Sequence, residues 1–172
     1  MHPQLKIMRQ FVDVPNQIWE SCQNVIQEKR YTPKEIIIRE GQTFNKMFFL
    51  KRGIARFYTI KDGIEITTNV FFKDSFPIDF HAYLTEEPTK YFFEALTDCE
   101  ITILPKSFII DTYEKNSLMQ KFGRLIAEKS FIQLSERVNS LFNLTPEERY
   151  LELLNNKPHY FKKLPQHIIA SY

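Results

Sequence analysis

Residues 31–105 consist of short apolar runs separated by turn sequences, and this pattern constrains the fold more than any other feature of the chain. Lys61-Asp62-Gly63 separates the runs 54–60 and 64–72, and Asp-Gly between two apolar runs predicts a tight hairpin. Other turns are predicted at Glu40-Gly41, Lys51-Arg52-Gly53 and Thr97-Asp98-Cys99-Glu100. Many short strands with little helix between them predict a compact antiparallel roll or sandwich.

Helices are predicted on both sides of this region. The segment up to about residue 30 has apolar residues at helical spacing, which predicts a helix that caps the next domain. A much longer helix is predicted from Asn116 or Ser117, either of which can serve as its N-cap, to about Phe142.

The long helix carries two apolar stripes. The first has the four-three spacing of a heptad seam and consists of Ala127, Phe131, Leu134, Val138 and Leu141. The second lies on a neighbouring face and consists of Leu118, Phe122, Leu125 and Ile132. Two stripes predict two contacts, one with the helix's own domain and one with a second copy of the chain. The alternative is a single wide face buried in a monomer.

Three further features predict small helices after the long one. Thr145 is a suitable N-cap because Pro146 follows at the first helical position and two glutamates occupy the first turn. Lys157-Pro158 ends this helix, and Leu164-Pro165 begins another.

Composition allows a sizeable core and excludes several classes of site. Apolar residues make up 43% of the 172 residues, and 16 Phe with 8 Tyr make that core rich in aromatic rings. Two isolated cysteines exclude a disulfide framework and an iron–sulfur cluster. The net charge of +2 neither requires nor excludes nucleic acid. With no apolar leader and no membrane-length apolar run, a cytoplasmic protein without a membrane partner is expected.

The order of parts resembles the Crp/Fnr family of transcription regulators. Three stretches look like the family's roll: the Glu40-Gly41 turn with the run that ends at Gly53, the Lys61–Gly63 hairpin, and 95–100. Residues 142–150 look like its hinge and first DNA-domain helix, and 164–172 look like the opening of its helix-turn-helix.

The resemblance implies a mainly β fold with α-helices. It comprises an antiparallel β-roll (a double-stranded β-helix like the cyclic nucleotide-binding domain), an N-terminal helix, a long C-terminal dimerisation helix and the start of a winged helix-turn-helix. The implied parts are a sensor roll over 1–115, the dimerisation helix over 116–142, and 143–172 as the hinge and an incomplete DNA-binding domain. The hinge residues are Phe142, Asn143 and Leu144.

The phosphate cassette is where this sequence departs from the family. In members that bind cyclic nucleotides, the cassette resembles Gly-Glu, a short loop and Arg-Ser. The Glu position falls on Asp79, between Ile78 and Phe80, and the Arg-Ser positions fall on Thr89 and Lys90. The guanidinium that forks onto phosphate is therefore missing, and Ile78 lacks the backbone freedom of Gly.

The adenine contact is altered as well. The polar pair on the long helix that reaches the base in such members matches Leu134 and Ser135, so one of its two donors is replaced by an apolar side chain. We therefore expect no bound cAMP or cGMP and no other cofactor. The roll either takes an unidentified small-molecule effector or binds nothing and supports the dimer.

Metal and catalytic sites are not expected. No His-x-His pair occurs, and His81 near Asp79 is more typical of a surface loop than of a metal site. Neither a nucleophile elbow nor a Gly-rich phosphate loop is present. These observations argue against a cupin-like metal enzyme and against an enzyme of any other class.

Basic residues are the remaining functional candidates. Lys157, Lys162 and Lys163 precede the implied helix-turn-helix, where they are expected to contact DNA phosphates. The basic residues of the long helix, which include Arg137, are expected to form a solvated face.

The leading hypothesis is therefore an effector-responsive, homodimeric transcription regulator. The resemblance implies double-stranded DNA as the partner of its complete C-terminal domain, and RNA polymerase as a further candidate. The alternative is a small-molecule or cyclic-nucleotide sensor module that acts on a protein partner without binding DNA.

Overall fold

The computed structural model describes residues 3–172. The described residues form two compact units, and the chain passes from the first to the second between Phe122 and Gly123. The strands are β1 Gln27–Tyr31, β2 Ile36–Ile38, β3 Lys46–Arg52, β4 Ile54–Lys61, β5 Ile64–Phe72, β6 Phe92–Ala95 and β7 Cys99–Pro105. The helices are α1 Pro3–Met8, α2 Asn16–Gln23, α3 Phe80–Thr85, α4 Lys106–Lys115, α5 Ser117–Asn143, α6 Pro146–Asn156, α7 Pro158–Lys163 and α8 Gln166–Ser171.

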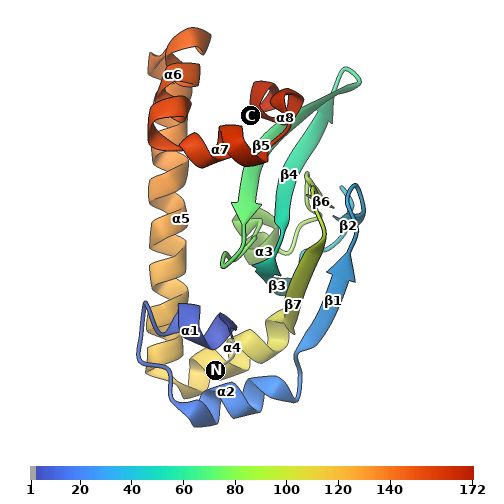
Figure 1. The fold of residues 1–172 in the computed structure, drawn as a ribbon. Coiled ribbons are helices and arrows are strands. Elements are labelled where there is room, and N and C mark those ends of the chain that lie inside the picture. Colours follow the sequence, from blue (N-terminus) through green and yellow to red (C-terminus); the bar gives the residue numbers. More distant parts are fainter. Residues whose placement is uncertain (1–2) are drawn as a thin grey trace. The chain divides into compact units, whose positions relative to one another are not determined.

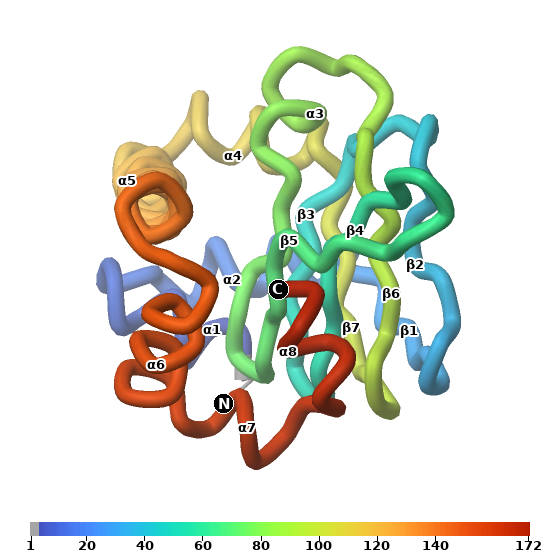
Figure 2. Tube along the Cα trace, turned by 90° about the horizontal axis from the view of Figure 1, so that it is seen from above, coloured from blue at the N-terminus to red at the C-terminus, as the bar shows by residue number. Residues whose placement is uncertain are grey.

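The strands of the first unit form two antiparallel sheets, in the orders β1-β7-β3 and β2-β6-β4-β5 (Figures 1 and 2). The longest pairing joins β4 to β5, from Ile54 opposite Phe72 to Lys61 opposite Ile64. Asp62 and Gly63 form the turn with φ values of 53° and 78°, the left-handed conformation that a two-residue hairpin turn requires. The predicted antiparallel roll and its Asp-Gly hairpin are confirmed.

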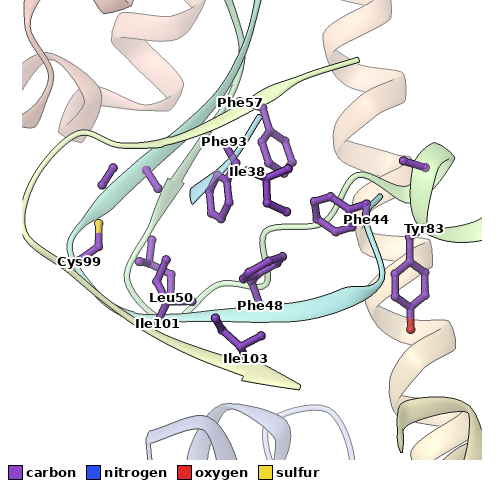
Figure 3. Packing of buried hydrophobic residues seen from close by; sticks show 13 residues of the cluster. Ile38, Phe44, Phe48, Leu50, Phe57, Tyr83, Phe93, Cys99, Ile101 and Ile103 are labelled. Atoms are coloured by element: carbon purple, nitrogen blue, oxygen red, sulfur yellow. The ribbon is translucent and has the colours of Figure 1, made fainter. Parts of the chain in front are cut away.

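Aromatic side chains fill the space between the two sheets (Figure 3). Phe57 of β4 is central, because its ring lies 4.9 Å from both Phe71 and Phe93 and 6.2 Å from Phe44. Phe48 of β3 continues the cluster, 5.5 Å from Phe93 on the other sheet. Edge-to-face ring contacts of this kind stabilise a core beyond what the buried area alone contributes.

The helices α1, α2 and α4 gather at the end of the strands away from the β4–β5 hairpin (Figure 1). The first residues of α5 belong to the same unit, and Asn116 caps this helix by accepting from the main-chain N–H groups of Leu118 and Met119 at 3.0 and 3.2 Å. Phe122 is buried between the rings of Phe11 and Phe76, at 5.8 and 5.5 Å. The predicted N-cap and one of the two predicted contacts of the long helix are thus observed.

The N-terminal region is not helical as far as residue 30. The helix α2 ends at Gln23, and β1 follows as a strand whose Gln27 lies opposite Ile103 and whose Tyr31 lies opposite Cys99. Four of the five residues of β1 are exposed. An edge strand of this kind has no apolar alternation, so its place in the sheet depends on pairing with β7, which local sequence does not encode.

The second unit comprises the rest of α5 and the three short helices that follow it. Thr145 and Glu148 form a capping box at the start of α6, in which Glu148 accepts from the Thr145 N–H at 2.8 Å and Thr145 accepts from the Glu148 N–H at 3.3 Å. The helix α6 ends at Asn156, before Lys157-Pro158, and Pro165 directly precedes α8, as predicted, whereas the helix α7 that begins at Pro158 was not predicted.

Two predicted boundaries need correction. Phe142 and Asn143 belong to the last turn of α5, so the predicted hinge narrows to Leu144, the only non-helical residue before the Thr145 cap. The Leu144 N–H still donates to the Ser140 carbonyl at 3.1 Å, which explains why the helix continues so far. The first compact unit also reaches Phe122 rather than residue 115, because Met119 and Phe122 are buried.

None of the described helices has both the length and the apolar character needed to cross a membrane.

Candidate functional site: a closed cassette on the roll

Asp79 lies at the centre of the region that the sequence analysis matches to the family's phosphate cassette. It is the N-cap of α3, and its Oδ1 accepts from the Ala82 N–H at 3.3 Å. Its Oδ2 accepts from the Thr89 hydroxyl at 2.6 Å. Asp79 and Thr89 are only 6% and 3% exposed, so the two side chains satisfy one another inside the protein.

The main chain fixes Thr89 in this position. Its N–H donates to the Gln42 carbonyl at 2.9 Å, and its carbonyl accepts from the Gly41 N–H at 2.8 Å. Its hydroxyl oxygen also accepts from the Tyr91 N–H at 3.2 Å. The segment that carries Thr89 is therefore hydrogen-bonded to the turn at Gly41, where φ is +83° and Gly is favoured.

Tyr91 connects the cassette to the aromatic core. Its ring stacks on Phe57, with 5.8 Å between centroids. Burial, and secondarily the negative charge of Asp79, raise the pKa of Tyr91. The aromatic core therefore extends to Tyr91, two residues after Thr89.

The other predicted pocket residues have different environments. Ile78 packs against the core cluster, Phe80 is half-buried at the start of α3, and Lys90 is exposed. The structure thus brings Ile78, Asp79, Phe80, Thr89 and Lys90 together at one place on the roll. Leu134 and Ser135 belong to the second unit, where Leu134 is exposed and Ser135 is half-buried.

This arrangement offers little chemistry for a phosphate. Both carboxylate oxygens of Asp79 are occupied, and Thr89 supplies one neutral hydroxyl where a planar cation would make two charge-assisted hydrogen bonds. The Asp79–Thr89 pair forms a hydrogen-bonded brace between the start of α3 and the loop that precedes β6.

Sequence analysis missed a buried ionic cluster on β4. Arg56 is 4% exposed, its Nε donates to Glu94 at 2.7 Å, and its Nη1 donates to Thr67 at 3.1 Å. Its Nη2 pairs with Glu65, and its guanidinium lies 4.2 Å from the Tyr58 ring centroid. The available signals were an Arg within the apolar run 54–60 and a Glu within Phe92–Ala95. A buried charge needs a partner, so each of these two residues indicates that a partner of opposite charge lies nearby, without specifying which residue it is.

The predicted dimer seam lies on an exposed surface of the second unit. Phe131 and Leu134 are 69% and 59% exposed, Val138 and Leu141 are also exposed, and Ala127 is half-buried. Of the predicted phosphate contacts, Lys162 and Lys163 are exposed in the last turn of α7, whereas Lys157 is half-buried. No cluster of three or more His, Cys, Asp or Glu in residues 3–172 is placed to hold a metal ion.

The two-sheet roll has the fold of a cyclic nucleotide-binding domain. The family model of the cyclic nucleotide-binding domain matches residues 28–116, slightly more than half of the chain. The chain belongs to the cyclic nucleotide-binding domain family.

Solved structures of Crp/Fnr regulators share this fold. A transcriptional regulator of the crp/fnr family from Eubacterium rectale superposes with a TM-score of 0.74 at 14% identity, over 93% of this chain and 77% of that protein. The catabolite activator protein of Thermus thermophilus gives 0.64 at 14% identity, over 81% of this chain. The cAMP-bound regulatory domain of Toxoplasma gondii PKA gives 0.54 at 20% identity, over 63% of this chain.

The chain spans 63% of the length of the Thermus protein and 42% of that of the Toxoplasma protein. No curated protein sequence matches the chain significantly.

Removing the Thr89 hydroxyl should weaken the roll. In Thr89→Val, the buried Asp79 carboxylate loses its donor without regaining water, which we expect to lower the free energy of unfolding by about 1–3 kcal/mol. Urea denaturation measures the change. Thr59→Val, a half-buried threonine of β4, is the matched control and should stay within about 0.5 kcal/mol. Equal stabilities for the two variants would show that the brace contributes nothing.

Proposed function

We propose that this chain is the sensor and dimerisation part of a cytoplasmic, non-enzymatic transcription regulator of Crp/Fnr type. In this proposal the roll receives a signal, two copies meet along α5, and the C-terminal helices belong to a domain that binds double-stranded DNA. RNA polymerase is a further proposed partner.

The observation that carries the proposal is the surface of α5 in the second unit. A row of apolar side chains at heptad spacing is left exposed there, with Phe131 and Leu134 the most exposed members. Large exposed apolar patches mark interaction sites, and a two-fold dimer brings the same patch of each copy together. The helices α6, α7 and α8 follow this row directly, which supports a role in carrying a second functional domain.

The closed cassette supports the view that the effector is neither cAMP nor cGMP. A cyclic phosphate would have to displace the Thr89 hydroxyl from Asp79 and would meet a carboxylate instead of a cation. Phe57 and Tyr91 also occupy the adjacent interior with stacked rings. An unidentified small molecule, or a purely supporting roll, is consistent with both features.

Calorimetric titration of the protein with cAMP should give no measurable binding heat at micromolar concentration. The reason is the missing guanidinium at Thr89. A dissociation constant tighter than about 10 µM, which corresponds to about −7 kcal/mol, would contradict this expectation. The paired variant Asp79→Glu with Thr89→Arg restores the chemistry of the family's cassette and is expected to gain affinity relative to the parent chain.

Charges placed in the seam should abolish the dimer. We expect Phe131→Asp with Val138→Asp to give monomers in light scattering, since burying each large apolar side chain contributes about 1.5–3 kcal/mol. Gln133→Asp with Asn139→Asp adds the same charges to exposed positions of the same helix outside the seam and should remain dimeric. If Phe131→Asp with Val138→Asp remains dimeric, the dimer interface lies outside the seam.

DNA recovered with the protein from cells should contain a two-fold symmetric site whose half-sites lie about one helical turn apart. Lys162→Gln with Lys163→Gln should weaken binding to all sequences equally and lower the salt dependence, because phosphate contacts carry no sequence information. Lys29→Gln with Lys34→Gln, two exposed lysines of the roll, is the control. Recovery of a protein partner without DNA would favour a sensor module that acts on proteins.

A further inference from the structure

Arg137 of α5 contacts Tyr172, the residue that follows α8, inside the second unit. Its guanidinium carbon lies 3.7 Å from the centroid of the Tyr172 ring, and its Nη2 donates to the Tyr172 main-chain oxygen. Arg137 is half-buried, whereas a basic residue of a solvated helix face would be exposed. The contact combines stacking with a charge-assisted hydrogen bond, two geometries that a guanidinium supports simultaneously.

Side chains from α7 and the end of α6 complete the cluster around Tyr172. The Tyr160 ring is buried 5.5 Å from the Tyr172 ring. The Lys157 ammonium lies 5.4 Å and 5.8 Å from the Tyr160 and Tyr172 centroids, and 3.5 Å from the Tyr172 hydroxyl. Burial, followed by the adjoining Tyr172, raises the pKa of Tyr160, which keeps the Tyr160 hydroxyl protonated.

The helix α7 has six residues, well below the length at which an isolated helix persists in water, so its stability depends on its contacts with the rest of the second unit. Leu164 and Ile168 bury apolar surface within the C-terminal helices. Arg137 of the long helix contacts Tyr172, the residue that follows α8, and this contact helps to position these helices along α5.

Arg137 also lies beside the exposed seam. It immediately precedes Val138, and successive residues of an α-helix are about 100° apart around its axis. One helix therefore carries the apolar row on one face and the Tyr172 contact on the adjacent face.

We propose that Arg137 clasps α7 and α8 to the long helix through Tyr172, so that these helices move with the helix that carries the seam. The role of the clasp in signalling rests on the proposed function. Its existence depends on neither DNA nor a second copy of the chain.

A double-mutant cycle on the full chain tests the clasp, with amide hydrogen exchange measured by NMR. Two reporter amides are suitable: Leu164, which donates to the Tyr160 carbonyl at 2.8 Å, and Ile168, which donates to the Pro165 carbonyl at 3.0 Å. Arg137→Met should speed exchange at both by about tenfold, the scale of a partly desolvated cation–π contact. In the Tyr172→Leu background the same substitution should have less than about a twofold effect, because its stacking partner is already gone.

Controls separate the clasp from a general loss of helix stability. Arg124→Met removes an exposed arginine of the same helix, whose side chain pairs with Glu128, and should leave both amides unchanged. Tyr172→Phe keeps the ring and should retain most of the protection. If Arg137→Met fails to fold, Arg137→Lys, which keeps the charge but loses the planar stack, should give an intermediate acceleration.

Two results would overturn the clasp. One is exchange within about twofold of the parent chain in Arg137→Met, and the other is equal acceleration in the parent and Tyr172→Leu backgrounds. A monomeric parent chain, or a protein without DNA affinity, would instead count against the proposed function and would leave the outcome of this cycle unchanged.

Discussion

The aromatic cluster around Phe57 is the interaction on which the roll depends. Phe57 meets Phe44, Phe71, Tyr91 and Phe93, so residues from β4, β5, β6 and the segments next to them converge on one ring. A short-stranded roll has few long sheet pairings to hold it together, and large interdigitating side chains compensate by burying much apolar surface per residue.

The same packing determines what the cassette can be. Because Tyr91 is held against Phe57, the adjacent segment that carries Thr89 is held as well, and the Thr89 hydroxyl meets Asp79 at 2.6 Å. An acidic cap that is satisfied by a neutral hydroxyl is stable without a ligand. A cassette with a buried cation would instead need a bound anion to be equally stable. This difference is the physical basis for proposing a regulator whose effector is not a cyclic nucleotide.

Local chemistry made the turns and caps predictable. Asp62-Gly63 adopts the left-handed backbone that its residue types favour, and Thr145 forms its capping box with Glu148. The position of β1 and the Arg56 cluster depend on partners distant in sequence, such as Ile103 and Glu94, and no local pattern specifies those pairings. The cassette residues could be located from the family resemblance, whereas their mutual hydrogen bond required the folded chain.

Arg137 shows that the role of a charged helix residue cannot be inferred from the sequence of the helix alone. Counted along the helix, it is one of several basic residues and is typical of a solvated surface. In the folded chain its guanidinium is partly removed from water by Tyr172, and a cation that loses water needs compensation from a ring face or an acceptor. Because the contact lies next to the apolar row of α5, a small rotation of this helix at a dimer interface would displace α8 directly. Transmission would then require no flexible linker, and the single non-helical residue Leu144 would only have to redirect the chain into α6.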